Sequence, residues 1–366
     1  MLTLSLIFFL IYFSVHFYYI HIGRFKANQL LKNNDHSEKI SLDDLIVIIP
    51  FRNEKERIKP LLKSIRNSSH LPKQIIFVDD HSDDDSSALI QQTLHDLNVI
   101  MLHLDENSVG KKSAIQLGIN HSDTSMILTL DADTWFHDKY FNNLTMIQKS
   151  DLVILPIQFN CPNFSSALIH LDVILLNELN YGLSGVSKPI VASGANLMFS
   201  KECFNKYNYL HEHITQLSGD DMFLLQNFKK NNSHIQVIPS SLLFVHTDVV
   251  RTFKELINQR SRWLKKMKTL KDTKAKFWGF YEVFNQLFLS GLILYGLFSF
   301  NYKFCFIILG LKIILDCFFY FKSLFKLFRN WSIPLLICYQ IFFPIYTIII
   351  GFSMLFTKVS WKGRPI

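Results

Sequence analysis

The feature that most constrains this chain is an uncharged apolar segment at its beginning, from Leu2 to Ile20. Its length is about that of a helix crossing the hydrocarbon core of a bilayer, so it predicts one membrane span. A cleavable signal peptide is the alternative, but no basic residue precedes the segment and no small-x-small cleavage pattern follows it. Arg24, Lys26 and Lys32 come soon after. Because positive charge tends to stay on the cytoplasmic side, these residues place the following domain in the cytoplasm.

The last quarter of the chain is apolar as well. Three runs, Phe284 to Phe300, Phe304 to Phe321 and Ile333 to Phe356, predict two or three further spans. Basic residues between the last two runs favour a cytoplasmic loop there, so the first two runs would form a hairpin. These basic residues are Lys322, Lys326 and Arg329. The third run either crosses, leaving the basic tail from Lys358 to Arg364 outside, or turns back near Pro344 as a re-entrant segment.

Charge and cysteine content exclude other classes of protein. The formal net charge of +8 could suggest nucleic acid, but the middle of the chain has no stripe of Lys and Arg interleaved with exposed aromatics. Much of the basic charge flanks the apolar runs, which indicates contact with anionic headgroups of membrane lipids and no nucleic-acid partner. The 5 cysteines show no metal-ligand spacing, so we expect reduced thiols and neither a disulfide framework nor a zinc site.

The middle of the chain alternates strand, polar loop and helix, which is typical of an α/β fold with a parallel sheet covered on both faces. Leu45 to Ile49, Ile75 to Val78 and Met126 to Leu130 are short aliphatic runs of the buried-strand type. A helix is predicted from Lys55 to Ile65. Polar residues follow each of the three strands, and ligands of open α/β sheets bind at the carboxyl ends of strands, so these polar clusters should meet at one crevice.

Asp131-Ala132-Asp133 is the most informative of these clusters. Two carboxylates that flank a small residue at a strand end provide hard oxygen ligands for Mg²⁺ or Mn²⁺. An isolated Asp-x-Asp sequence also occurs by chance in ordinary loops, so its position after Met126 to Leu130 and the motifs around it matter.

The ordered motifs resemble those of the family 2 glycosyltransferases of the GT-A fold, in the branch whose C-terminal part is membrane-embedded. The resemblance spans about Leu45 to Trp263. Its segments are Val47-Ile48-Ile49-Pro50 with Asn53-Glu54, Val78-Asp79-Asp80, Gly110-Lys111 with Ala114 and Gly118, Asp131 with Asp133, Gly194-Ala195-Asn196, Gly219-Asp220-Asp221, and Gln259-Arg260-Ser261-Arg262-Trp263.

The resemblance implies a hexosyltransferase with a Rossmann-like, mainly parallel sheet and terminal transmembrane helices. It divides the chain into an anchor over 1–22, a cytoplasmic catalytic domain over 41–275 and a membrane region over 276–366. The nucleotide diphosphate sugar, UDP-linked in this family, would contact Pro50, Glu54, Asp79, Asp80, Lys111, Asp131 and Arg262. A lipid or glycan acceptor would lie beside Gly194, Asn196, Gln259 and Trp263. The cofactor, Mg²⁺ or Mn²⁺, would be held by Asp131 and Asp133.

Asp221 matches the family's general base, which removes the proton of the acceptor hydroxyl during inverting transfer. Gly-Asp-Asp at a helix start is also a common helix cap, and both roles are compatible. Two departures stand out: Asp220 replaces the more usual Glu, and His81 replaces the usual Gly after Asp80. They leave open which of Asp220 and Asp221 is the catalytic base.

Other interpretations remain open at this stage. A polyprenyl-phosphate sugar transferase shares the nucleotide and metal motifs but would not need Gln-x-x-Arg-Trp. A non-catalytic membrane assembly protein with the same fold would not need every carboxylate. The resemblance places the protein in the bacterial inner membrane. The tail Trp361-Lys362-Gly363-Arg364 also resembles this branch, where it is either a topological signal or a contact with diphosphate or lipid.

Overall fold

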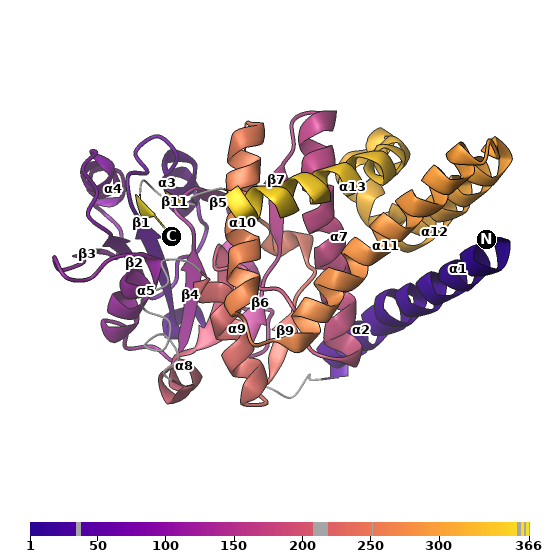
Figure 1. Cartoon of the computed structure of the whole chain (residues 1–366). Coiled ribbons are helices and arrows are strands. Elements are labelled where there is room, and N and C mark those ends of the chain that lie inside the picture. The colour runs from indigo at the N-terminus through magenta and orange to yellow at the C-terminus, as the bar shows by residue number, and fades with distance from the viewer. Residues whose placement is uncertain (34–37, 208–218, 251, 357–359, 362–363, 366) are drawn as a thin grey trace. The chain divides into compact units, whose positions relative to one another are not determined.

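A computed structural model describes residues 1–33, 38–207, 219–250, 252–356, 360–361 and 364–365 (Figure 1). The chain forms two compact units, each assembled from separate segments. The sheet unit comprises Leu31–Asn160, Val191–Val249 and Lys358–Ile366, and the helix unit comprises Met1–Leu30, Cys161–Ile190 and Val250–Thr357. Residues 161–190, expected within the 41–275 domain, thus pack with the helices.

The sheet unit is built on a mainly parallel sheet, which confirms the predicted α/β class. Its strands, in spatial order, are β3 (Val99–His103), β2 (Gln74–Asp79), β1 (Leu45–Phe51), β4 (Met126–Leu130), β8 (Asn196–Ser200), β6 (Leu152–Ile154) and β9 (Ile235–Val237). The first four are mutually parallel, and β6 is parallel to β9. Strand β8 runs antiparallel to both of its neighbours.

Helices cover both faces of this sheet, as predicted. Alternate residues of a strand point to opposite faces, and every residue of β1 is buried. Leu45, Val47 and Ile49 share a core with α3 (Lys59–Arg66), α4 (Ser86–Leu94) and α6 (Tyr140–Leu144). On the other face, α5 (Lys111–Asn120) lies so close that a Cβ on Gly118 would be 2.8 Å from the Ile48 side chain.

The predicted start of the first helix, Lys55, is wrong. Helix α3 begins at Lys59 because the preceding residues form a turn around the backbone carbonyl of Glu54. This carbonyl accepts hydrogen bonds from the backbone N–H groups of Arg57 and Ile58. Pro60 lies in the first turn, where its missing N–H costs no helical hydrogen bond.

A second, three-stranded sheet follows directly from the Asp131-Ala132-Asp133 turn. Strand β5 (Thr134–Phe136) pairs antiparallel with β10 (Val245–Asp248), which pairs parallel with β7 (Ile157–Asn160). The described part of the sheet unit also holds α8 (Lys201–Tyr207), α9 (Asp220–Lys230), β11 (Ser360–Trp361) and β12 (Arg364–Pro365).

Among the described residues, three helical stretches are long and apolar enough to cross a membrane, Leu2–Lys32, Tyr302–Phe328 and Ser332–Ser353. They belong to the helix unit except for the last two residues of the first stretch. The elements of the helix unit are α1 (Leu2–His16), the π-helix η1 (Phe17–Ile22), α2 (Gly23–Asn33), α7 (Phe164–Val186), α10 (Phe253–Thr269), α11 (Thr273–Phe298), α12 (Tyr302–Phe328) and α13 (Ser332–Phe356).

Two features of the C-terminal helices bear on the alternatives that the sequence left open. The run Phe284 to Phe300 lies mostly in α11, which is not among the three stretches and buries two amides, Asn285 and Gln286. Helix α13 continues through Pro344, so the chain makes no re-entrant turn there.

A buried charged group joins α1, α12 and α13. The Lys312 ammonium lies 2.7 and 2.6 Å from the two carboxylate oxygens of Asp316, and both side chains are buried. The Tyr12 hydroxyl donates to one of these oxygens at 2.7 Å, and the Gln340 amide donates to the other at 2.8 Å. Buried charges require such pairing, because an unpaired ion in an apolar environment is strongly disfavoured.

Helix α7 meets the N-terminal helix through glycines that allow contact between the two backbones. A Cβ on Gly182 would lie 2.0 Å from the backbone oxygen of Tyr19, and one on Gly185 would lie 2.0 Å from that of Gly23. Small residues permit such close crossings in helical membrane proteins.

We therefore expect Gly182→Ala to destabilise the helix unit by about 1–3 kcal/mol, the usual cost of overpacking a tight contact. Thermal unfolding of the detergent-purified chain measures the loss. Gly279→Ala is the matched control, since no atom lies within 4 Å of the Cβ it would add to α11. An unchanged melting temperature for Gly182→Ala would show that this contact is not needed for stability.

Candidate active site

The acidic residues predicted to bind the nucleotide and the metal converge at one edge of the large sheet. Strands β2, β1 and β4 are parallel neighbours, so their carboxyl ends lie at the same edge. Asp79 ends β2, Asp80 follows it, and Asp131 follows the last residue of β4. Pro50 lies near the end of β1, beyond the residues that pair with β4.

Asp79 and Asp80 are both buried. The Asp79 carboxylate accepts hydrogen bonds from the Ser82 backbone N–H at 2.9 Å and the Ser87 hydroxyl at 3.0 Å. Burial raises the pKa of the Asp80 carboxyl, and a hydrogen bond from the Gly110 backbone N–H opposes this shift. His81, where the sequence departs from the family pattern, adopts a positive φ of 58°.

Arg57 links two of the predicted site residues and was not predicted from the sequence. Its Nε lies 2.8 Å from the buried Glu54 carboxylate, and its NH1 lies 3.7 Å from the Asp133 carboxylate. The spacing of three residues from Glu54 is the signal that sequence reasoning could have used, because the turn after β1 brings positions 54 and 57 together.

Asp131 is held next to Lys111, which is the first residue of α5. The Lys111 ammonium lies 2.5 Å from Asp131 Oδ1. The Thr134 hydroxyl donates to the Asp131 backbone carbonyl at 2.7 Å and fixes the turn between β4 and β5. Gly110, which precedes the helix, has a φ of 90°, a conformation that favours glycine.

The electrostatics of Asp133 suit a group that binds a cation. Loss of hydration raises the pKa of its carboxyl, and the negative charge of Asp131 raises it further. Arg57 and Lys111 act in the opposite direction. A divalent cation between Asp131 and Asp133 would relieve the repulsion between these carboxylates.

The donor set fits Mg²⁺ or Mn²⁺ bound together with a diphosphate. Within the described residues, no group of three or more His, Cys, Asp or Glu side chains is arranged as a complete metal site. Asp131 and Asp133 would supply part of the oxygen coordination. Substrate phosphates and water commonly complete the coordination of Mg²⁺.

Asp221 lies at the start of α9 and contacts the predicted acceptor-side loop. Its carboxylate accepts from the Gly194 backbone N–H at 3.4 Å and from the Met222 backbone N–H at 2.7 Å. Gly219 precedes the helix with a φ of 95°. Asp220 is the first residue of α9, and only its backbone is described.

The Asn196 side chain connects the start of β8 to α6 and to the segments that precede β7 and β10. It is fully buried, and its amide donates to the backbone carbonyls of Pro156 and Leu243 at 2.9 and 3.1 Å. Its carbonyl oxygen accepts from the Tyr140 hydroxyl at 2.6 Å. We therefore assign Asn196 a positioning role at the start of β8, in place of the expected contact with the acceptor.

The Gln-x-x-Arg-Trp residues lie on α10 of the helix unit, so their predicted donor and acceptor contacts stay predictions. Within this segment of α10, Arg260 makes several contacts with other helices. Its guanidinium donates to the Tyr346 hydroxyl at 2.7 Å and to Asp172 at 2.9 Å, and lies 4.3 Å from the centre of the Trp263 ring system. Arg262 and Gln259 are half-buried on the same helix.

The C-terminal motif is described only in part. Trp361 in β11 pairs antiparallel with Arg364 in β12, while Lys362 and Gly363 lie outside the described residues. Lys358, at the start of the predicted basic tail, lies outside them too.

The mainly parallel sheet, with an Asp-x-Asp turn at the end of β4, defines the GT-A class of glycosyltransferase folds. Residues 46–207 match the family described as glycosyl transferase family 2. Residues 46–207 are therefore similar to the glycosyl transferase family 2 domain, and the match covers less than half of the chain.

Three similar proteins illustrate the relationship. An undecaprenyl-phosphate 4-deoxy-4-formamido-L-arabinose transferase of Proteus mirabilis is 35% identical over 97 residues, which are 25% of this chain and 29% of that protein. A poly-beta-1,6-N-acetyl-D-glucosamine synthase of Staphylococcus aureus is 28% identical over 124 residues, 33% of this chain and 28% of that protein. The chain thus spans less than a third of the length of these relatives.

A solved structure shares the fold across most of the chain. The mannosyltransferase of Pyrobaculum calidifontis, in complex with GDP-Man and Mn²⁺, superposes with a TM-score of 0.51 at 14% identity. The match covers 95% of this chain and 98% of the mannosyltransferase.

Proposed function

We propose that this protein is a metal-dependent, inverting hexosyltransferase that transfers a sugar from a UDP-linked donor to a hydroxyl of a lipid or glycan acceptor at a membrane. The observation that carries the proposal is the set of charged side chains at the ends of β1, β2 and β4. Asp131 and Asp133 lie there beside Lys111 and Arg57, inside a family 2 domain.

The nucleotide would bind to the groups at the ends of β1 and β2. The Asp79 carboxylate, held by Ser82 and Ser87, is suited to accept a hydrogen bond from the uracil imide. Glu54 and Asp80 would order the base and ribose. Lys111 would contribute positive charge for the diphosphate.

Asp131 and Asp133 would hold Mg²⁺ or Mn²⁺, whose charge, when bound, would stabilise the departing diphosphate. Lys111 already contacts Asp131, so the same ammonium would stay close to the phosphates. Arg57 would keep Glu54 and Asp133 in place through its two contacts.

Asp221 would serve as the general base. As the acceptor oxygen forms its bond to the anomeric carbon, the bond to the diphosphate oxygen breaks and the hydroxyl proton passes to the carboxylate. Hydrogen bonds from Gly194 and Met222 fix the orientation of that carboxylate. Attack from the face opposite the leaving group inverts the anomeric configuration.

A second candidate is transfer to a polyprenyl phosphate, which the similarity to the undecaprenyl-phosphate sugar transferase of Proteus mirabilis favours. Such an acceptor is already ionised at neutral pH, so it needs no base. The loss of turnover when Asp221 is replaced therefore distinguishes a hydroxyl acceptor, which needs a base, from a phosphate acceptor, which does not.

We further propose that the protein resides in the bacterial inner membrane with the sheet unit on the cytoplasmic side. The three apolar helical stretches support membrane insertion, and Arg24 and Lys26 after the first apolar run support this orientation.

The first prediction concerns the metal. Asp133→Asn should abolish transfer, because an amide cannot replace an anionic ligand of a divalent cation. Donor-dependent release of nucleotide diphosphate with Mn²⁺, across a panel of UDP- and GDP-sugars in a lipid extract, measures activity. Asp123→Asn is the control, since this exposed carboxylate pairs only with Lys73 among the described residues. Activity that survives both EDTA and Asp133→Asn would remove the metal from the mechanism.

The second prediction concerns the base. Asp221→Asn should lower turnover about a hundred- to ten-thousand-fold and leave nucleotide binding nearly unchanged. Asp220→Glu should keep substantial activity. Turnover and nucleotide affinity, measured on the same preparation, separate the two effects. An active Asp221→Asn together with an inactive Asp220→Asn would reverse the assignment, and two active Asn variants would favour the phosphate acceptor.

The third prediction concerns topology. Cysteines placed at exposed positions of the sheet unit, such as Asp123→Cys, should resist impermeant thiol reagents in intact cells and react in inverted vesicles. Labelling in intact cells would place the site outside and contradict the proposed orientation.

A further inference from the structure

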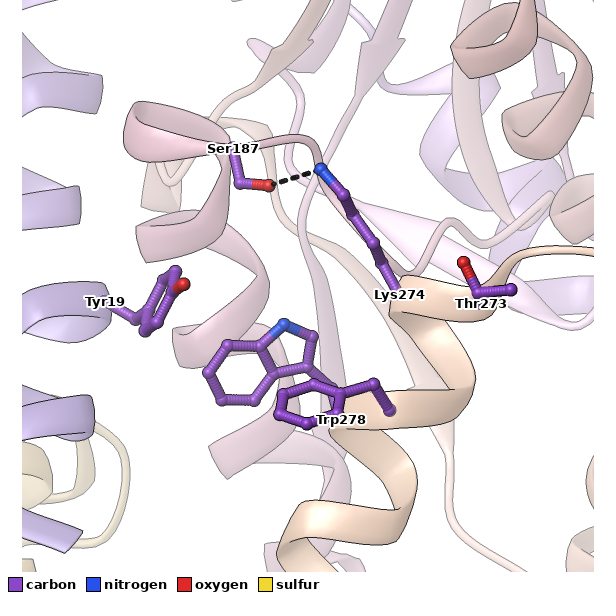
Figure 2. A pocket seen from close by; sticks show the side chains of 6 residues that line it. Tyr19, Ser187, Thr273, Lys274 and Trp278 are labelled. Atoms are coloured by element: carbon purple, nitrogen blue, oxygen red, sulfur yellow. Dashed lines mark hydrogen bonds between the residues drawn. The ribbon is translucent and has the colours of Figure 1, made fainter. Parts of the chain in front are cut away.

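A pocket of the helix unit lies where η1, the end of α7 and the start of α11 come together (Figure 2). It encloses about 360 Å³ and is lined by Tyr19, Ser187, Thr273, Lys274, Phe277 and Trp278. The proposed glycosyl transfer uses none of these residues.

Every polar side chain that lines the pocket can donate a hydrogen bond, and one of them, Lys274, is a cation. The Lys274 ammonium donates to the Ser187 hydroxyl at 3.4 Å, a long contact that leaves other donor positions of the ammonium available. Thr273 adds a second hydroxyl. No carboxylate is among the described residues that line the pocket. The nearby Asp272 side chain caps its own helix, where it accepts a hydrogen bond from the Ala275 backbone N–H.

Trp278 adds a further hydrogen-bond donor to the pocket lining. The residue is only 5% exposed, and its indole N–H can donate but not accept. Figure 2 shows the nitrogen side of the ring turned toward Ser187 and Lys274. An acceptor atom bound in the pocket could therefore receive a hydrogen bond from this N–H.

The rest of the pocket wall is aromatic. The ring centres of Tyr19 and Trp278 are 4.7 Å apart at an interplanar angle of 81°, and Phe277 lies edge-on to Trp278. Phe277 is 59% exposed. Tyr19 belongs to the first membrane-length stretch, just before the basic Arg24. Tyr, Trp and Lys together at the charged end of an apolar helix are typical of the membrane–water interface.

We propose that this pocket binds the phosphate of an anionic membrane lipid. Lys274, the two hydroxyls and the Trp278 N–H would surround the phosphate oxygens, and the aromatic wall would contact the glycerol and the first acyl carbons. A free sugar fits less well, because it carries no anionic group to pair with the Lys274 ammonium. The proposal is independent of the glycosyl transfer.

Titration of the detergent-purified full-length chain with phosphatidylglycerol, followed by native mass spectrometry, tests the proposal. Diacylglycerol with the same acyl chains and inorganic phosphate are the comparison ligands. We expect phosphatidylglycerol to bind more tightly than either. Lys274→Gln should weaken it about fivefold, the effect of one lysine near a lipid surface. Trp278→Phe, which keeps an aromatic ring and removes the N–H, should weaken it about two- to fivefold.

Lys276→Gln is the matched control, since it removes the same charge two residues further along α11, outside the pocket lining. Equal weakening by Lys276→Gln would show diffuse surface attraction and overturn the site. Inorganic phosphate binding as tightly as phosphatidylglycerol would overturn the lipid assignment, and equal binding of diacylglycerol would overturn phosphate recognition. If Lys274→Gln lowers the melting temperature, Ser187→Ala takes its place with the same expected direction.

Discussion

Repulsion between carboxylates is the constraint around which the strand-end site is organised. Parallel strands deliver their carboxyl ends to one edge, so Asp79, Asp80 and Asp131 accumulate there. Folding such a cluster requires compensation, which comes from Lys111, Arg57 and backbone N–H groups of the adjoining loops. The same balance suits a ligand that carries both a cation and phosphates. The cation can take over part of the compensation, which leaves Lys111 and Arg57 available to the phosphates.

The sequence predicted this part of the molecule well, since local patterns determine it. The strand Met126–Leu130 has the predicted bounds, and the aliphatic runs of β1 and β2 lie within their observed strands. The alternation of strand and helix, together with polar residues after each strand, was enough to place Asp80 and Asp131 at one edge. Lys111 was assigned to the same site only through the family resemblance.

Features that depend on contacts distant in the sequence were not predictable in this way. The role of Asn196 follows from carbonyls supplied by Pro156 and Leu243, which no local pattern connects. Helix α7 is apolar enough to pack in either unit. Its glycines contact the N-terminal helix only after both helices have folded. Arg57 could have been identified from its spacing of three residues from Glu54. Its contacts, however, depend on the turn that occupies the first part of the predicted helix.

The charged group around Asp316 bears on the order in which the helix unit is assembled during synthesis. Tyr12 and its hydrogen-bond partner are 304 residues apart, so the first helix leaves the ribosome long before its partner exists. Gln340, which completes the group, is made later still. The N-terminal helix can enter a membrane early, but it acquires this polar anchor only after α12 and α13 have been made. A chain truncated before α13 would leave Asp316 short of one donor in an apolar environment, which gives a membrane quality-control system a physical basis for recognising incomplete chains.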